Sequence, residues 1–364
     1  MFAGSALAAV EIAPPAAQPA PVVFSESLGF DAGAALRAAM QAAASGDRSL
    51  AEERLLAVAA QAPVVADYAD LERMRLRVAA GAYAEAIALG QNWAHPESPL
   101  VADREEILGA AYEGLGQAEE AAAAWQRAAK ASDDLDRQAA LLRAIAENRR
   151  EADAADATEA AYLALWTAHP LTPEGEQAEQ ALARIAAAKG RDPRTAVHFR
   201  RRGDALFRKR HNESALAAYE RALAFEDQTA SERDRARRQR ARTLFRLRRY
   251  DAAAEAFGQL PPRPEHRIAR ARAFARGGDV LRGIRELLQV AAEQRGPTAA
   301  RARYLAALLL EGEGDDARAR ELYEEVSRSS DGTPYAFAAL WRFGWSEFRS
   351  GNFDAAARYF DRLV

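Results

Sequence analysis

A cassette of three residues recurs along this chain: a glycine, an alanine five residues later, and a bulky apolar residue about one helical turn further on. The first three glycines of this kind are 35 residues apart and the last two are 37 apart. Complete copies begin at Gly46, Gly81, Gly116, Gly314 and Gly351. Weaker copies carry Arg210 or Arg248 in place of the glycine. A repeat of this length and content predicts an array of helical hairpins.

The residue types in the cassette fit the parts of such a hairpin. Glycine adopts the left-handed conformation that ends the first helix, and alanine lets the second helix approach closely. The residue seven positions before the turn is also small in most copies: Gly109, Gly203, Ala241, Ala271, Ala307 and Gly344. Met74 and Arg143 break this rule, so we expect those hairpins to be less regular. Because one hairpin cannot bury its apolar face alone, the units must stack. The predicted fold is all-α, a right-handed α-superhelix (solenoid) of tetratricopeptide-like hairpins.

The chain divides by composition into three parts. Residues 1–27 resemble a signal-peptide remnant followed by a Pro/Ala-rich linker, although no Lys or Arg precedes Arg37 and an ordinary tail is the alternative. Residues 28–190 and 191–364 are predicted as two helical-repeat regions, joined at 190–193. No run of 18 apolar residues occurs, so we expect no transmembrane segment. Cysteine is absent, which is compatible with an oxidising compartment. We therefore expect a periplasmic, exported protein.

The most basic part of the chain lies between residues 191 and 285, although the formal net charge of the whole chain is only −3. Within it, five arginines fall at helical spacing on one face: Arg235, Arg238, Arg242, Arg246 and Arg249. This stripe is a candidate site for an anionic ligand, and the alternative is a solvated helix face. It lacks the regular alternation of basic and aromatic residues that stacks bases, so we predict no nucleic-acid partner.

The sequence offers no recognisable catalytic constellation. Its five histidines (His95, His169, His198, His211 and His266) are scattered, and none has a metal-ligand partner four residues on. Phosphate-cradling loops and serine-nucleophile motifs are absent as well. We therefore assign no catalytic residue, no metal and no cofactor, and we expect a scaffold or a binding surface.

Three segments resemble the helical region of the soluble lytic murein transglycosylases. The first is the run from Pro334 to Phe360, in which an L-W-R-x-G-W helix precedes a glycine turn. The second runs from Ala66 to Ala69 and leads to Gly81–Ala86, and the third is the proline-bracketed joint from Leu165 to Glu174. The resemblance implies the N-terminal superhelical (U-shaped) part of an enzyme that cleaves peptidoglycan.

The residues that would carry that family's chemistry are missing. Its catalytic E-S motif and following G-L-M-Q segment do not occur, and neither Glu26-Ser27 nor Glu97-Ser98 has the right continuation. We therefore expect the chain to be a scaffold truncated before a C-terminal catalytic domain in cis, with peptidoglycan or a protein partner in its concave groove. Whether the chain is itself part of an enzyme stays open. The alternative is a stand-alone exported repeat adaptor that binds a protein partner.

An aromatic cluster marks the end of the chain and includes Trp341, Trp345 and Phe348. Exposed rings in such a cluster would form a sugar-binding platform. The helical spacing of these three residues favours a different role, namely packing between hairpins together with a docking face for a continuation of the array.

Overall fold

The computed structural model describes residues 31–152, 154–329 and 333–363. This part of the chain forms nineteen α-helices and two short 3-10 helices and contains no strand, which confirms the all-α solenoid of tetratricopeptide-like hairpins. Within the same residues, no helix combines the length and apolar character needed to cross a membrane. The predicted signal remnant and linker, residues 1–27, lie outside the described residues.

The described part of the chain divides into two compact units, unit 1 before residue 125 and unit 2 from residue 125 onward, and the division falls within helix α6 (Ala118–Ala131). The joint expected at residues 190–193 lies between two helices of unit 2, and the division into 28–190 and 191–364 stays a prediction. The described helices of unit 1 are α1 (Ala32–Ala44), α2 (Arg48–Gln61), the 3-10 helix η1 (Pro63–Val65), α3 (Ala66–Ala79), α4 (Tyr83–Gln91) and α5 (Val101–Gly114).

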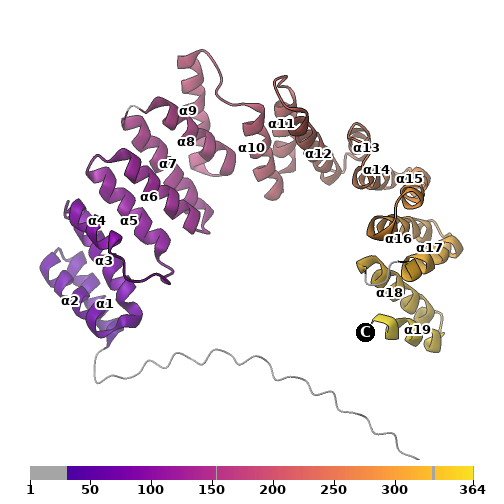
Figure 1. Cartoon of the computed structure of the whole chain (residues 1–364), viewed down its shortest axis with the longest axis horizontal. Helices are drawn as coiled ribbons and strands as arrows, with labels where there is room; N and C mark the ends of the chain where they lie inside the picture. Colours follow the sequence, from indigo (N-terminus) through magenta and orange to yellow (C-terminus); the bar gives the residue numbers. More distant parts are fainter. Residues whose placement is uncertain (1–30, 153, 330–332, 364) are drawn as a thin grey trace, which may run out of the picture. The chain divides into compact units, whose positions relative to one another are not determined.

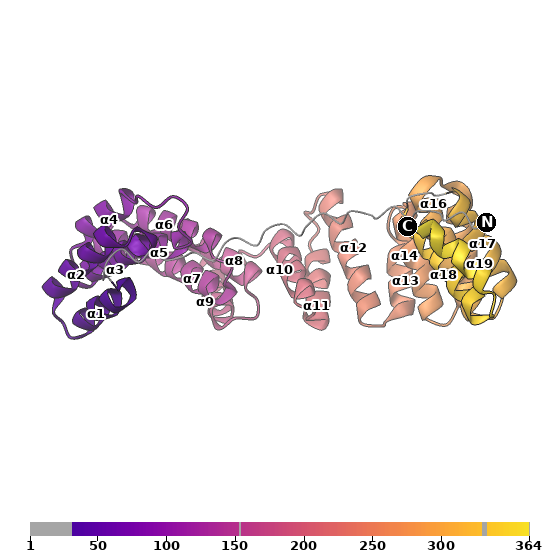
Figure 2. The ribbon, with the colours of Figure 1, turned by 90° about the horizontal axis from the view of Figure 1, so that it is seen from below.

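Unit 2 continues with antiparallel pairs and one additional helix (Figure 1). Its first helices after α6 are α7 (Leu135–Glu151), α8 (Ala155–Ala168) and the additional α9 (Pro173–Lys189). Four further pairs precede the last one: α10 (Ala196–Arg208) with α11 (Asn212–Leu223), α12 (Ala230–Arg246) with α13 (Tyr250–Gly258), α14 (Pro264–Arg276) with α15 (Val280–Glu293), and α16 (Gly296–Gly312) with α17 (Asp316–Ser329). The last pair is α18 (Pro334–Arg349) with α19 (Phe353–Phe360), followed by η2 (Asp361–Leu363). Figure 2 shows the same succession of helices from a second direction.

The close contact inside a hairpin joins the small residue of the first helix to a ring of the second. A Cβ added to Gly203 would lie 2.7 Å from the Tyr219 ring, and one added to Gly344 would lie 2.4 Å from the Phe360 ring. Both distances are below van der Waals contact, so only glycine leaves room for these rings. Met74 departs from this rule because Gly90 in the second helix supplies the space instead, and Met74 is fully buried.

The turns confirm the role that we assign to the glycine of the cassette. All five cassette glycines have positive φ angles, between 72° and 86°. Arg210 and Arg248, which replace glycine in the weaker copies, adopt the same region with φ angles of 64° and 59°. They are the two non-glycine residues with positive φ in the described chain. Their side chains clash with the backbone in this conformation, which costs stability.

Each first helix has one face that is formed by the same positions of the repeat. Counted from the small residue, its members lie three residues before, one after and four after, which places them on one side of the helix. We call this set the register face. In α12 it consists of Arg238, Arg242 and Phe245, and in α18 it consists of Trp341, Trp345 and Phe348.

Replacing Arg248 by glycine is predicted to stabilise unit 2 by about 1 kcal/mol, because the strain of the left-handed conformation disappears. The extra entropy of the unfolded glycine variant offsets part of this gain. The reverse exchange, Gly314→Arg, is predicted to destabilise it by about 1–2 kcal/mol. Both changes are read from urea unfolding followed by circular dichroism. Equal midpoints for the two variants would show that the turn conformation is misassigned.

Candidate functional site

A basic pocket of about 400 Å³ lies on unit 2, where residues of α10, α12, α13, α14 and α16 meet. Five arginines and one glutamate line it, together with three phenylalanines, one alanine and His266. The arginines come from three successive first helices: Arg238, Arg242 and Arg246 from α12, Arg272 from α14, and Arg301 from α16. We call these five residues the arginine pocket.

Aromatic rings hold several of these guanidinium groups in place. The Arg246 guanidinium lies 3.5 Å from the centre of the Phe207 ring, and its Nη1 donates a 2.8 Å hydrogen bond to the Phe207 carbonyl oxygen. Arg272 lies over Phe245 at 5.4 Å. Such stacking restricts a guanidinium to one plane and leaves its other N–H groups directed elsewhere. These two arginines are therefore oriented before any ligand arrives.

No carboxylate of the described residues forms an ion pair with any of the five arginines. The Nε atom of Arg238 is buried and has no hydrogen-bond partner. Arg242 donates only to the amide oxygen of Gln239, at 3.1 Å. Glu265 is the one carboxylate that lines the pocket, and it is exposed. The pocket therefore keeps a strong positive charge that the described chain does not neutralise.

The acidic residues of the neighbouring register faces are bound elsewhere. Asp204 of α10 accepts hydrogen bonds from Arg200 at 2.6 Å and from the Tyr219 hydroxyl at 2.8 Å. Glu311 of α16 accepts from Arg342 at 2.6 Å and from the Tyr323 hydroxyl at 2.8 Å. Because these internal partners already bind both carboxylates, neither one offsets the arginine pocket.

The arginines also repel one another. The pKa of Arg246 is lowered, first by burial and then by the nearby charges of Arg242 and Arg210. Burial also lowers the pKa of Arg272, with further contributions from Arg301 and Arg276. A guanidinium stays protonated at neutral pH in spite of such shifts. Besides burial, neighbouring positive charges contribute to both shifts.

The structure places only three of the five arginines of the predicted stripe in the pocket. Arg238, Arg242 and Arg246 line the pocket, whereas Arg235 does not. Arg249 lies beyond the end of α12 and forms an ion pair with Glu213 at 2.9 Å. Sequence reasoning missed Arg272 and Arg301 because they lie on other helices, although alignment of the register faces would have found Arg272. That the stripe binds an anion stays a prediction.

An exposed aromatic row runs along one side of α18 and reaches the start of α19. Trp341 and Trp345 stack with ring centres 5.8 Å apart and planes 8° apart, and Trp345 stacks on Phe348 at 5.6 Å. The members of the row are between 43% and 62% exposed: Phe337, Trp341, Trp345, Phe348 and Phe353. An exposed apolar patch of this kind is a candidate binding surface.

Within the described residues, Trp341, Trp345 and Phe348 therefore do not pack between hairpins as expected, whereas their role as a docking face for a continuation of the array stays a prediction. These rings occupy the register face of α18, whereas other rings of the cluster, such as Phe343, are buried against neighbouring helices. A spacing of four and three residues identifies one side of a helix but does not identify what covers that side.

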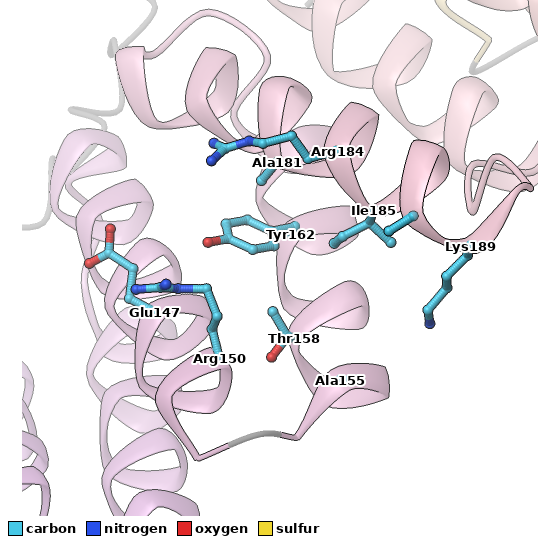
Figure 3. A pocket seen from close by; sticks show the side chains of 10 residues that line it. Glu147, Arg150, Ala155, Thr158, Tyr162, Ala181, Arg184, Ile185 and Lys189 are labelled. Atoms are coloured by element: carbon cyan, nitrogen blue, oxygen red, sulfur yellow. The ribbon is translucent and has the colours of Figure 1, made fainter.

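A second pocket of about 540 Å³ lies among α7, α8 and α9 (Figure 3). Figure 3 shows the Tyr162 ring across its middle, with the hydroxyl toward the side of Glu147 and Arg150. Here the charged groups have internal partners: Glu147 pairs with Arg143 at 3.6 Å, and Lys189 pairs with Glu159 at 2.8 Å. The arginine pocket is the better candidate because its charges lack such partners.

The other residues that the sequence singled out have structural roles. Ser98 donates a 2.7 Å hydrogen bond to Asp67 and thereby fixes the loop before α5. Trp166 is almost fully buried beneath Arg202, whose guanidinium lies 4.5 Å from the ring centre. The other E-S pair, Glu26-Ser27, lies outside the described residues. Across the parts of the chain that the structure describes, no group of histidines and carboxylates is arranged to hold a metal ion.

Comparison with known proteins yields structural similarity alone. No protein-family model matches the chain, and no curated protein sequence matches it. Similar solved structures include MamA, with 20% identity over 44% of this chain and 91% of that one and a TM-score of 0.36. The C-terminal part of a TPR repeat-containing protein from Cytophaga hutchinsonii has 14% identity over 74% of this chain and 99% of that one, with a TM-score of 0.37. Yeast Tom70 has 12% identity over 92% of this chain and 84% of that one, with a TM-score of 0.36. The description of the fold rests on the hairpins themselves.

Replacing Arg242 and Arg301 together by glutamine is predicted to leave the free energy of unfolding unchanged or to raise it by up to about 1 kcal/mol at low ionic strength. The reason is that Arg242 repels Arg246 and Arg301 repels Arg272. The gain is expected to shrink as NaCl is added. Thermal unfolding in low and high salt measures both effects. A clear loss of stability at low salt would show that these arginines have stabilising partners.

Proposed function

We propose that this chain is a tetratricopeptide-like scaffold that binds an extended segment of a protein partner along the register faces of unit 2. One observation carries the proposal: the register faces of α12 and α18 present arginines and aromatic rings that no described part of the chain covers or neutralises. Trp and Arg are the residue types that contribute most to protein interfaces. Stacked hairpins repeat such positions at regular intervals, which suits an extended ligand.

We also propose that this scaffold acts in the periplasm. The whole sequence contains no cysteine, so an oxidising compartment poses no risk of unwanted disulfides. The signal remnant expected at residues 1–27 agrees with this proposal, but these residues lie outside the described part of the chain.

Selection of displayed random peptides on the immobilised chain tests the binding function. The wild-type chain is expected to enrich a common sequence, and Arg242→Ala/Trp345→Ala is expected to lose it, because both changes fall on the same register position of two hairpins. Arg237→Ala/Leu281→Ala removes an exposed arginine and an exposed apolar residue away from the register face and serves as the matched control. Enrichment that survives in the register-face variant would contradict the proposal.

A second candidate function is the superhelical scaffold of a lytic murein transglycosylase. The observation that favours it is the exposed Trp341–Trp345 stack, which lies in the segment that resembles this family and could hold a sugar ring. The conclusion that the chain binds peptidoglycan depends on that resemblance.

Co-sedimentation with purified murein sacculi separates the two candidates. If the partner is a protein, the chain is expected to stay in the supernatant and to release no anhydro-muropeptides. Binding to sacculi that is lost in Trp341→Ala/Trp345→Ala and kept in Arg237→Ala/Leu281→Ala would favour the murein scaffold instead.

A further inference from the structure

We infer that the arginine pocket binds an acidic peptide segment, in which several Asp or Glu side chains enter between α12, α14 and α16. This inference rests on the proposed function and names the chemistry of the partner. Five guanidinium groups line a pocket of about 400 Å³, a volume within the range of ordinary ligand sites. Planar guanidinium forks match carboxylate groups, which accept two parallel hydrogen bonds from them.

The arrangement of the donors favours a ligand with several carboxylates over a single small anion. Arg238, Arg272 and Arg301 come from three consecutive first helices, so one small anion contacts only part of the set. Arg246 is fixed by the Phe207 ring and carbonyl, and Arg272 is held over Phe245. Because these groups are oriented in advance, a ligand loses less conformational freedom on binding them.

Binding of the ligand would offset the repulsion among the arginines. Burial and then the charge of Arg242 lower the pKa of Arg246, and burial and then the charge of Arg301 lower the pKa of Arg272. Carboxylates between these guanidinium groups would reduce that repulsion. The pocket thus offers both geometry and charge for acidic side chains.

The same contacts disfavour a nucleic acid. Base stacking needs an open aromatic face, but Phe207 is only 6% exposed and Arg246 covers its ring. Two neighbouring arginines also have internal partners, because Arg249 pairs with Glu213 and Arg240 pairs with Glu220.

The test measures fluorescence anisotropy of a labelled octaglutamate peptide with the purified full chain, beside an octaglutamine peptide and an octathymidylate strand. Octaglutamate is expected to bind, and octaglutamine is not. Arg238→Ala/Arg272→Ala is expected to weaken binding by at least about tenfold, whereas the control Arg237→Ala/Arg285→Ala, which removes two exposed arginines outside the pocket, is expected to change it by less than about twofold.

Arg242→Gln/Arg301→Gln provides a second pocket variant that is expected to fold at least as well as the wild type. It should also bind octaglutamate at least about fivefold more weakly, so that loss of binding is separated from loss of folding. Equal weakening in the control would show nonspecific charge attraction and overturn the inference. Octathymidylate that binds more tightly than octaglutamate would also overturn it, in favour of a nucleic acid. Displayed peptides that are enriched but lack Asp and Glu would refute the inference and leave the proposed function intact.

Discussion

The stack of hairpins depends on one contact, in which a ring of the second helix reaches the backbone of the first. At Gly203 and Gly344 there is no space for even a methyl group beside Tyr219 and Phe360. This approach fixes how the two helices of a pair are rotated about their axes. Once that rotation is fixed, the residues three before, one after and four after the small residue always fall on the same side. The contact that builds the hairpin therefore also decides which residues occupy the register face.

The two candidate surfaces are chemically different versions of one position in the repeat. Arginines and a phenylalanine occupy the register face of α12, whereas three aromatic residues occupy that of α18. In α10 and α16 the same face carries Asp204 and Glu311, which bind internal partners. The face varies only in part, because some of its members pack in the core: Phe207 of α10 is 6% exposed and Ile268 of α14 is 1% exposed.

Much of the fold followed from the sequence because turns and close contacts leave local marks. The glycine turns, the substitution of Arg210 and Arg248 into them, and the small residues of the first helices were all predictable from spacing. The arginine pocket was only partly predictable, since Arg272 and Arg301 join Arg238 through contacts between repeats. The exposure of Trp341 could not be predicted either, because helical spacing identifies one face of a helix but not the element that packs against that face. Met74 was an exception that only the space provided by Gly90 explains.

The left-handed turn at Arg210 has a consequence for the electrostatics of unit 2. A glycine there would relax the backbone but would carry no charge. Arginine accepts the strain and adds a positive group whose field contributes, after burial and the charge of Arg242, to the lowered pKa of Arg246, one hairpin further along. The residue that strains the turn therefore also adds positive potential at a neighbouring surface. A single side chain links the turn geometry of one repeat to the charge environment of the next.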